Sequence, residues 1–555
     1  MQIDKPLKLY IASWAEGIGG GAARMESYYM RFFDRSTIIP VHVSLKSRNP
    51  ESPCYAGLED SIYAPKTEKF NFLVDLFSDA DIVQFQGSFD PLVCEAAKAA
   101  RVPLLIEVLH NIEQGGLFPE INASICVSKA VQSAQAESRI QEGLCPIIRN
   151  GIALEDFPFR NLTQEEQINS KSPLKILQVG AREKIKIHLD EISPIIFEKY
   201  PYAECIIAGR GQILNSNERI SYMGVTNEIA SLYRDADLMI LLSGAEPFGL
   251  ACIEAMASGA IPIVSNEGAF PEIIEHGVTG FLLNIEQVYQ NPEILLNTID
   301  CFTNSRINDM RIMARKSVEL KFSARDCIRQ YQDYYLHLYE DVSKKSLVKR
   351  SRLISKRTKT PPNALVGEAL YSFQENDIES MMSILQNIVN YKDPITNSTC
   401  VEVIADLALF LFSIDKITLG HDLFLHLFNG ETEREYVIER WLQSAALDIA
   451  SSNSREMVTL RNLLIGTYYS DSEFVLRLAE ILIRNNQPED AIKLLELAQE
   501  KLRSLSETKL NEKNISPDTF YVSGDNVNSN DVLPDYEAWI SRIKSELDKS
   551  DIRKT

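Results

Sequence analysis

The stretch Glu246-Pro-Phe-Gly-Leu-Ala-Cys-Ile-Glu-Ala-Met-Ala-Ser-Gly259 decides the fold, because it places a loop and a helix directly after a buried strand. The apolar run Leu238–Leu242 predicts that strand. Pro247 and Gly249 interrupt any continuous helix, so a new helix is expected to open near Gly249 and to end at the final glycine. The unit is therefore strand, loop and helix, with Glu246 in the loop and Glu254 on the helix.

The start of this helix suits an anionic ligand. Free backbone N–H groups and the positive end of the helix dipole lie there, and Phe248-Gly249 permits close approach of a diphosphate. Glu254, within two turns, can accept hydrogen bonds from the hydroxyls of a ribose, as acidic residues do in dinucleotide-binding folds. Glu246 can accept from a sugar hydroxyl. Acidic pairs are usually solvated, but these two flank Pro-Phe-Gly and an apolar helix, which favours a functional interpretation.

Short aliphatic runs alternate with longer amphipathic stretches from residue 8 to about residue 285. This alternation predicts parallel strands, buried on both faces, in doubly wound α/β sheets. The polar segment at 150–173 interrupts the series and predicts a linker between two similar lobes. Two lobes imply a cleft, with ligands bound beyond the carboxyl ends of the strands. The runs are Leu9–Ser13, Asp81–Gln86, Pro103–Leu109, Ala123–Ser128, Cys145–Arg149, Leu174–Gly180, Ala203–Gly209, Asp237–Ser243 and Ile261–Ser265.

Composition excludes several classes of protein. The 555 residues exceed one ordinary core, and 45% apolar with 24% charged residues is globular composition. A net charge of -20 argues against nucleic-acid binding. The nine cysteines form no Cys-x-x-Cys pair and mostly sit in apolar runs, which indicates reduced thiols in the cytoplasm. No signal peptide or membrane-spanning run is expected, so membrane contact is at most peripheral, on the cytoplasmic face.

Domain boundaries follow from changes in pattern. We expect an acceptor-side lobe at 1–160, a donor-side lobe at 170–340 whose last helix near Phe322–Tyr339 crosses back to the first lobe, and a basic linker at 341–363. The linker is interpreted as a solvated helix end rather than an anionic-lipid contact. Residues 364–503 predict an all-α helical-repeat region, a candidate for protein contacts, with a tetratricopeptide-type unit at 478–498. Residues 504–555 predict a polar tail with a short terminal helix.

The motif at 246–259, together with Pro262-Ile-Val-Ser265 and Gly277-Val-Thr-Gly-Phe281, resembles the family-4 retaining glycosyltransferases, or glycosyl transferases group 1, of the GT-B fold. The resemblance covers roughly residues 8 to 340. It implies two Rossmann-like lobes and a sugar-nucleotide donor. It also implies that Glu246 contacts the transferred sugar and that Glu254 contacts the nucleotide ribose.

Other segments match the same family in order. Gly19-Gly-Gly21 resembles its glycine loop, His110 its donor-sugar histidine, and Arg182 with Lys184 the cations that neutralise the leaving diphosphate. Lys186 competes with Lys184 for this role, because the loop after Arg182 is short. The resemblance therefore implies catalytic roles for Glu246, Arg182, Lys184 and His110. The donor-binding set is Gly20, Gly21, Arg182, Lys184, Gly209, Met223, Val225, Glu246, Phe248, Gly249, Leu250 and Glu254.

Two acidic pairs could hold a metal ion. Asp79-Ala-Asp81 and Asp235-Ala-Asp237 match the Asp-x-Asp pattern with which metal-dependent transferases bind a divalent cation. Each pair immediately precedes an apolar strand, so both are interpreted as turns between a helix and a strand. No metal and no other cofactor is therefore expected.

The resemblance implies a retaining transfer of a hexose-type sugar from a nucleoside-diphosphate sugar, with a UDP-sugar preferred, to a hydroxyl of a glycan, lipid-linked or protein acceptor. Two alternatives stay open. One is a non-catalytic interaction protein with a degenerate GT-B core, against which the intact glutamate pair argues. The other is a nucleotide-sugar epimerase or a phosphorylase on the same fold, although the pyridoxal-bearing lysine context of a phosphorylase is not found.

Overall fold

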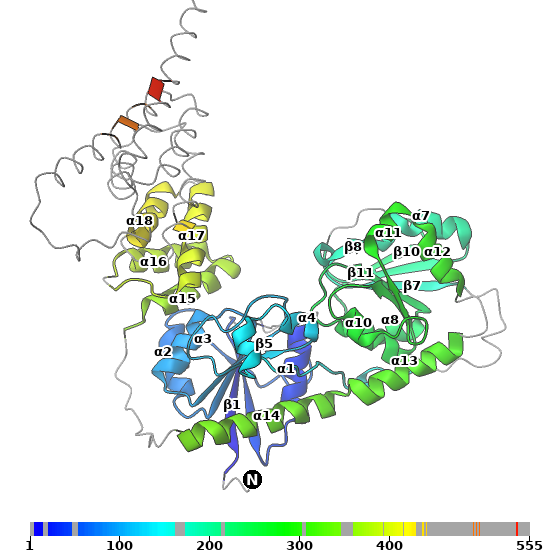
Figure 1. The fold of residues 1–555 in the computed structure, drawn as a ribbon, viewed down its shortest axis with the longest axis horizontal. Coiled ribbons are helices and arrows are strands. Elements are labelled where there is room, and N and C mark those ends of the chain that lie inside the picture. The colour runs from blue at the N-terminus through cyan, green and yellow to red at the C-terminus, as the bar shows by residue number, and fades with distance from the viewer. Residues whose placement is uncertain are drawn as a thin grey trace, which may run out of the picture. The chain divides into compact units, whose positions relative to one another are not determined.

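The structure is a computed structural model of the 555-residue chain. It describes residues 5–14, 20–46, 54–160, 173–211, 217–301, 307–345, 359–391, 393–414 and 416–428, with isolated positions beyond them. The chain divides into two compact units, Met1–Met381 and Met382–Thr555. The first unit contains two parallel sheets, each flanked by helices (Figure 1).

The first lobe is built on a six-stranded parallel sheet with the order β3-β2-β1-β4-β5-β6. Apolar runs form its central strands because both faces are covered by helices; all six residues of β5 are buried. The strands are β1 (Leu7–Ser13), β2 (Ile38–Ser44), β3 (Ile62–Tyr63), β4 (Ile82–Gln86), β5 (Leu104–Leu109) and β6 (Ala123–Cys126). The helices are α1 (Gly21–Phe32), α2 (Lys69–Phe77), α3 (Pro91–Ala99), α4 (Lys129–Gln132) and α5 (Glu137–Gln141).

The sheet of the second lobe has the order β10-β9-β7-β11-β12-β13, which is the same connectivity as in the first lobe. The additional strand β8 pairs antiparallel with β11. Leu238 of β11 pairs with Ile176 of β7 on one side and with Ile261 of β12 on the other. The strands are β7 (Lys175–Val179), β8 (Ile185–Ile187), β9 (Glu204–Ala208), β10 (Ile220–Gly224), β11 (Leu238–Ser243), β12 (Ile261–Ser265) and β13 (Phe281–Leu283). The helices are α7 (Leu189–Lys199), α8 (Ile229–Asp235), α9 (Leu250–Ser258), α10 (Phe270–Ile273), α11 (Ile285–Gln290), α12 (Glu293–Asp300) and α13 (Ile307–Lys321).

The predicted pair of α/β lobes is therefore confirmed, in an arrangement consistent with the GT-B fold. One predicted strand, Cys145–Arg149, is wrong. The segment makes a single parallel bridge, Cys126 to Ile147, at the edge of the first sheet. Pro146 accepts a hydrogen bond from the Cys126 N–H through its carbonyl, but it has no N–H with which to extend the ladder.

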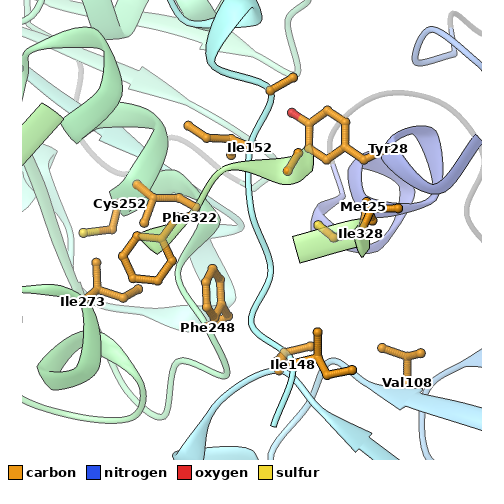
Figure 2. Packing of buried hydrophobic residues seen from close by; sticks show 14 of the residues in the cluster. Met25, Tyr28, Val108, Ile148, Ile152, Phe248, Cys252, Ile273, Phe322 and Ile328 are labelled. Carbon is orange, nitrogen blue, oxygen red and sulfur yellow. The ribbon is translucent and has the colours of Figure 1, made fainter. Parts of the chain in front are cut away.

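The two segments that cross between the lobes pair with each other. The Ile152 N–H donates to the Phe322 carbonyl and the Ala324 N–H donates to the Ile152 carbonyl, both at 2.9 Å. A Cβ on Gly151 would lie 2.8 Å from the Phe322 carbonyl oxygen, so this close approach requires glycine. Phe322 packs edge-on against Phe248, with ring centroids 5.9 Å apart, and Figure 2 shows both rings near Ile152.

Helix α14 (Ala324–Lys345) then packs against α1 of the first lobe, as predicted. The Tyr331 ring meets the Tyr29 ring edge-on at 5.1 Å, and the Tyr335 hydroxyl donates to Gln84 Oε1 at 2.5 Å. All of these side chains are buried. The helix thus joins the second lobe to the core of the first.

The described residues after 359 are helical, with α15 (Pro362–Gln374), α16 (Ile378–Val389), α17 (Ser398–Ser413) and α18 (Ile417–Phe428). Helix α15 packs against α3 of the first lobe. The tetratricopeptide-type unit at 478–498, the polar tail at 504–555 and most of the basic stretch lie outside the described residues. Within the described ranges, no helix combines the length and apolar composition needed to cross a membrane.

Candidate functional site

A cavity of about 500 Å³ lies where strands of both sheets end. In each sheet the strand order reverses between two neighbouring strands, β1 and β4 in the first lobe and β7 and β11 in the second. The loops after these four strands contribute to the lining, which is where open parallel sheets bind ligands. The lining includes Gly20, Gly21, Arg24, Gln86, Gly87 and His110 from the first lobe, and Lys184, Gly209, Arg210, Val225, Glu246 and Glu254 from the second.

Glu246 lies in the loop between β11 and α9, as predicted, and lines the cavity. Burial raises the pKa of its carboxyl group, while the charge of Lys184 and the backbone N–H groups of Gly249 and Phe248 oppose this rise. The backbone N–H groups at the start of α9, which the sequence suggested as donors to a diphosphate, therefore also act on the Glu246 carboxyl group. Gly249 is the N-cap residue of that helix, with a φ of 100°.

Glu254 faces the cavity from α9 with only 5% of its surface exposed. Arg24 of α1, in the other lobe, places its Nε 3.0 Å from Glu254 Oε1. Burial raises the pKa of Glu254, and Arg24 and the Tyr233 hydroxyl favour the ionised form. A buried carboxylate held by a cation can accept hydrogen bonds from a diol.

His110 directly follows β5 and lines the cavity from the first lobe. Its Nε2 lies 2.6 Å from Gln86 Oε1 at the end of β4, so this nitrogen carries the proton. Burial lowers the pKa of the ring to about 4. The imidazole is therefore neutral at pH 7 and offers hydrogen bonds rather than charge.

Of the two cations predicted to bind the diphosphate, only one lies at the cavity. Lys184 lines the cavity, whereas Arg182 does not. Arg182 is 8% exposed, and its Nη2 donates to both carboxylate oxygens of Asp190 at 2.8 and 3.0 Å. Lys186, the competing lysine, is exposed in β8 and does not line the cavity. The structure therefore brings Lys184, but not Arg182, to the other predicted residues.

The predicted glycines bring backbone close to the cavity. A Cβ on Gly21 would lie 3.0 Å from Leu250 Cδ1, so the glycine loop of one lobe faces the first residue of α9 in the other. At Gly209, φ is 136° and a Cβ would lie 1.9 Å from the Gly180 carbonyl oxygen, which excludes every other residue. Val225 and Phe248 also line the cavity, whereas Met223 is 40% exposed and does not. Gly19 lies outside the described residues.

Both Asp-x-Asp pairs are turns between a helix and a strand, as predicted. Asp79 accepts a hydrogen bond from the Tyr10 hydroxyl at 2.8 Å, and Asp81 accepts the Lys8 N–H at 2.9 Å. Asp237 accepts from the Lys175 N–H and from Arg311 Nη2, both at 3.0 Å. The two Asp-x-Asp pairs precede β4 and β11 and lie at the amino ends of these strands, whereas the cavity lies beyond the carboxyl ends.

Residues 166–312 match the Glycosyl transferases group 1 family model. This segment contains Lys184, Gly209, Glu246 and Glu254, and it ends within α13. Gly20, Arg24 and His110 lie outside the match, in the first lobe. The cavity thus combines residues of the segment that matches the group 1 family with first-lobe residues that this match does not include.

Individual proteins are similar to this chain over shorter or more distant matches. N-acetyl-alpha-D-glucosaminyl L-malate synthase of Bacillus anthracis is 32% identical over 25% of this chain and 35% of the relative. Uncharacterized glycosyltransferase MJ1607 of Methanocaldococcus jannaschii is 34% identical over 32% of this chain and 55% of the relative. The chain thus spans about a third and about half of these relatives. The structure of Anabaena Alr3699/HepE in complex with UDP and glucose is 17% identical, covers 60% of this chain and 100% of that chain, and has a TM-score of 0.44.

Sequence reasoning missed several residues of the cavity, among them four with polar side chains that bear on its chemistry. Gln86 ends a predicted strand, so its place at the carboxyl edge was available from the pattern. Arg24 and Arg210 lie in segments compared with the group 1 family, but no role followed from their spacing. Tyr233 lies on α8, and it influences the pKa of Glu254 because α8 and α9 pack together. Nothing in the local sequence indicates that contact.

Proposed function

We propose that this chain is a retaining glycosyltransferase that moves a hexose-type sugar from a nucleoside-diphosphate sugar to a hydroxyl acceptor. The observation that carries the proposal is the shared cavity, in which Glu246, Glu254 and Lys184 of the group 1 segment meet His110 and Gly21 of the first lobe. A UDP-sugar is the preferred donor. The acceptor is a glycan, a lipid-linked glycan or a protein.

The residues divide the proposed reaction between them. Glu254 accepts the ribose hydroxyls, and Lys184 lies where it can neutralise the leaving diphosphate. Glu246 and the neutral ring of His110 both line the cavity and hold hydroxyls of the transferred sugar. The acceptor hydroxyl then attacks the anomeric carbon as the bond to the diphosphate breaks, and its proton passes to the leaving phosphate. In this proposal side chains supply the cationic charge, so no metal ion is required.

Enclosure between two lobes supports transfer over hydrolysis, because it keeps bulk water from the reacting carbon. The nine cysteines are free thiols, seven of them buried, which supports placing the reaction in the reducing cytoplasm.

The test is a panel of nucleotide sugars with the full-length protein. We expect a donor to raise the melting temperature and to be consumed with release of nucleoside diphosphate once an acceptor is present. Glu254→Gln should weaken donor binding about ten- to a hundredfold, because a charged hydrogen-bond acceptor for the ribose is lost. Glu267→Gln, an exposed second-lobe glutamate outside the cavity, is the matched control and should bind like wild type.

The same panel separates the alternatives. Interconversion of one nucleotide sugar into its epimer, without release of nucleoside diphosphate, would favour an epimerase. Absence of binding to every donor would contradict the transferase proposal and favour a non-catalytic interaction protein.

A further inference from the structure

Among the residues that the structure describes, three cationic side chains line the cavity: Arg24, Lys184 and Arg210. Arg24 is already neutralised, because its Nε lies 3.0 Å from Glu254 Oε1 and both side chains are largely buried. Neither Lys184 nor Arg210 forms an ion pair with another residue that the structure describes. Two cations without an ion pair in one cavity favour an anionic ligand, although the charge of Lys184 also acts on Glu246.

Arg182, which the sequence assigned to this ligand, is committed elsewhere. Its Nη2 donates to both oxygens of Asp190, and the fully buried Asp190 also accepts from the Tyr222 hydroxyl at 3.1 Å. Its Nη1 is buried and has no hydrogen-bond partner in the part of the chain that the structure describes. Withdrawing Arg182 to reach a ligand would leave the buried Asp190 carboxylate without its cation, which is strongly unfavourable.

The backbone explains why one arginine is buried while the other lines the cavity. The loops after β7 and β9 are held together, because the Gly180 N–H donates to the Ala208 carbonyl and the Arg182 N–H donates to the Arg210 carbonyl, both at 3.0 Å. A Cβ on Gly211 would lie 2.6 Å from the Arg182 Cβ, so the Arg182 side chain packs directly against this loop. Arg210, on the same loop, is exposed and lines the cavity.

We propose that Arg210 is the second diphosphate-binding cation beside Lys184, and that Arg182 is a structural residue that fixes the loop carrying Arg210. This inference rests on the proposed function, because it presupposes a nucleoside-diphosphate ligand. A guanidinium can donate two parallel hydrogen bonds to phosphate oxygens, and Arg210 sits on a backbone made rigid by the adjoining β7 loop. Arg210 thereby favours the diphosphate over the nucleoside alone.

The experiment compares UDP with uridine by calorimetric titration of the full-length protein. We expect Arg210→Gln to weaken UDP binding about ten- to a hundredfold while changing uridine binding less than twofold. Arg210→Lys should recover part of the loss, because it restores the charge but not the paired hydrogen bonds. Arg234→Gln removes an exposed arginine of the same lobe that pairs with Asp235, and it should match wild type with both ligands.

Arg182→Gln is expected to lower the melting temperature and, where it folds, to retain the preference for UDP over uridine. The proposal is overturned if Arg210→Gln binds UDP within twofold of wild type, or loses UDP and uridine equally. It is also overturned if folded Arg182→Gln, rather than Arg210→Gln, loses the preference. If the wild-type protein binds none of UDP, ADP and GDP, the proposed function itself fails, and this inference fails with it.

Discussion

The buried carboxylate of Glu254 depends on Arg24, which belongs to the opposite lobe. Burial lowers the pKa of Arg24, but the charge of Glu254 together with Tyr55 and Tyr28 raises it overall. The two side chains are only 13% and 6% exposed, so solvent cannot replace either partner. Under the proposed function, the donor hydroxyls would bind to a carboxylate that a first-lobe cation already holds.

Removing Arg24 should destabilise the protein even without ligand. Arg24→Gln leaves Glu254 buried and unpaired, and we expect the free energy of unfolding at pH 7 to fall by about 3–5 kcal/mol in urea denaturation. The double variant Arg24→Gln, Glu254→Gln should regain much of that loss. Arg31→Gln is a control on the same helix, because its pair with Asp156 is more exposed and should be worth about 1 kcal/mol or less. Equal losses for both arginines would contradict a special role for the buried pair.

Two neighbouring residues of the first lobe should give opposite pH effects. Burial lowers the pKa of His110 to about 4, so below about pH 6.5 the unfolded chain binds a proton that the folded chain does not. Stability from this group is lost as pH falls from 6.5 to 4. Burial raises the pKa of Glu107 to about 7, so its contribution is lost as pH rises from 4.5 to 7. Each effect is at most about 3 kcal/mol.

Single variants should separate the two effects. Relative to wild type, His110→Gln should gain stability as pH falls from about 6.5 to 4.5, and Glu107→Gln should gain stability as pH rises over the same window. The glutamine at 107 can still accept the Gly116 N–H, which lies 2.5 Å from Glu107 Oε1. Chemical denaturation across this pH range measures both. Curves parallel to that of wild type would show that these groups do not titrate as described.

At the scale of elements, α15 is tied to the first lobe more closely than its predicted place in a separate helical region suggests. The Tyr371 hydroxyl donates to the buried carboxylate of Asp90, the N-cap residue of α3. The Tyr371 ring also stacks on Trp14, with centroids 4.1 Å apart, just after β1. The helix therefore contacts segments that follow β1 and β4, the two strands that flank the first-lobe side of the cavity.

The substitution Gly367→Ala tests this packing, because a packed and an unpacked α15 predict opposite changes in stability. A Cβ there would lie 2.7 Å from the Leu92 Cβ and 2.8 Å from its backbone nitrogen. In an unpacked helix Gly367→Ala would stabilise by about 1 kcal/mol, whereas the clash should destabilise by about 1–3 kcal/mol. Hydrogen exchange should then accelerate in α15 and α3 but not in the second-lobe strands. A stabilised α15 would contradict the packing.

The observed strands also show how much of the fold could be predicted from the sequence. Runs such as Ile261–Ser265 became strands as predicted, because residues apolar on both faces suit only a covered sheet. Strand β2 escaped prediction because Pro40 and His42 interrupt its apolar pattern. His42 is buried with its Nδ1 2.7 Å from the Ser61 hydroxyl, a partner nineteen residues away. Likewise, the Arg24–Glu254 and Arg182–Asp190 pairs are tertiary contacts. The family resemblance therefore placed Arg182 at the ligand and gave no role to Arg24.

At the scale of the first compact unit, polar contacts close the two lobes around the cavity. The Ser128 hydroxyl donates to the Pro247 carbonyl at 2.6 Å. Glu272 of the second lobe accepts the Lys129 N–H at 2.8 Å at the start of α4 and pairs with Arg149 at 3.1 Å. Together with Arg24 and Glu254, these contacts hold first-lobe residues against the loop and helix of the 246–259 motif.

The most direct measurement is a crystal structure of the full chain with UDP. We expect the ribose hydroxyls within hydrogen-bond distance of the Glu254 carboxylate and the diphosphate beside Lys184 and Arg210, between the two sheets. UDP bound elsewhere, or an empty cavity at saturating UDP, would contradict the assignment of this cavity to a nucleotide-sugar donor.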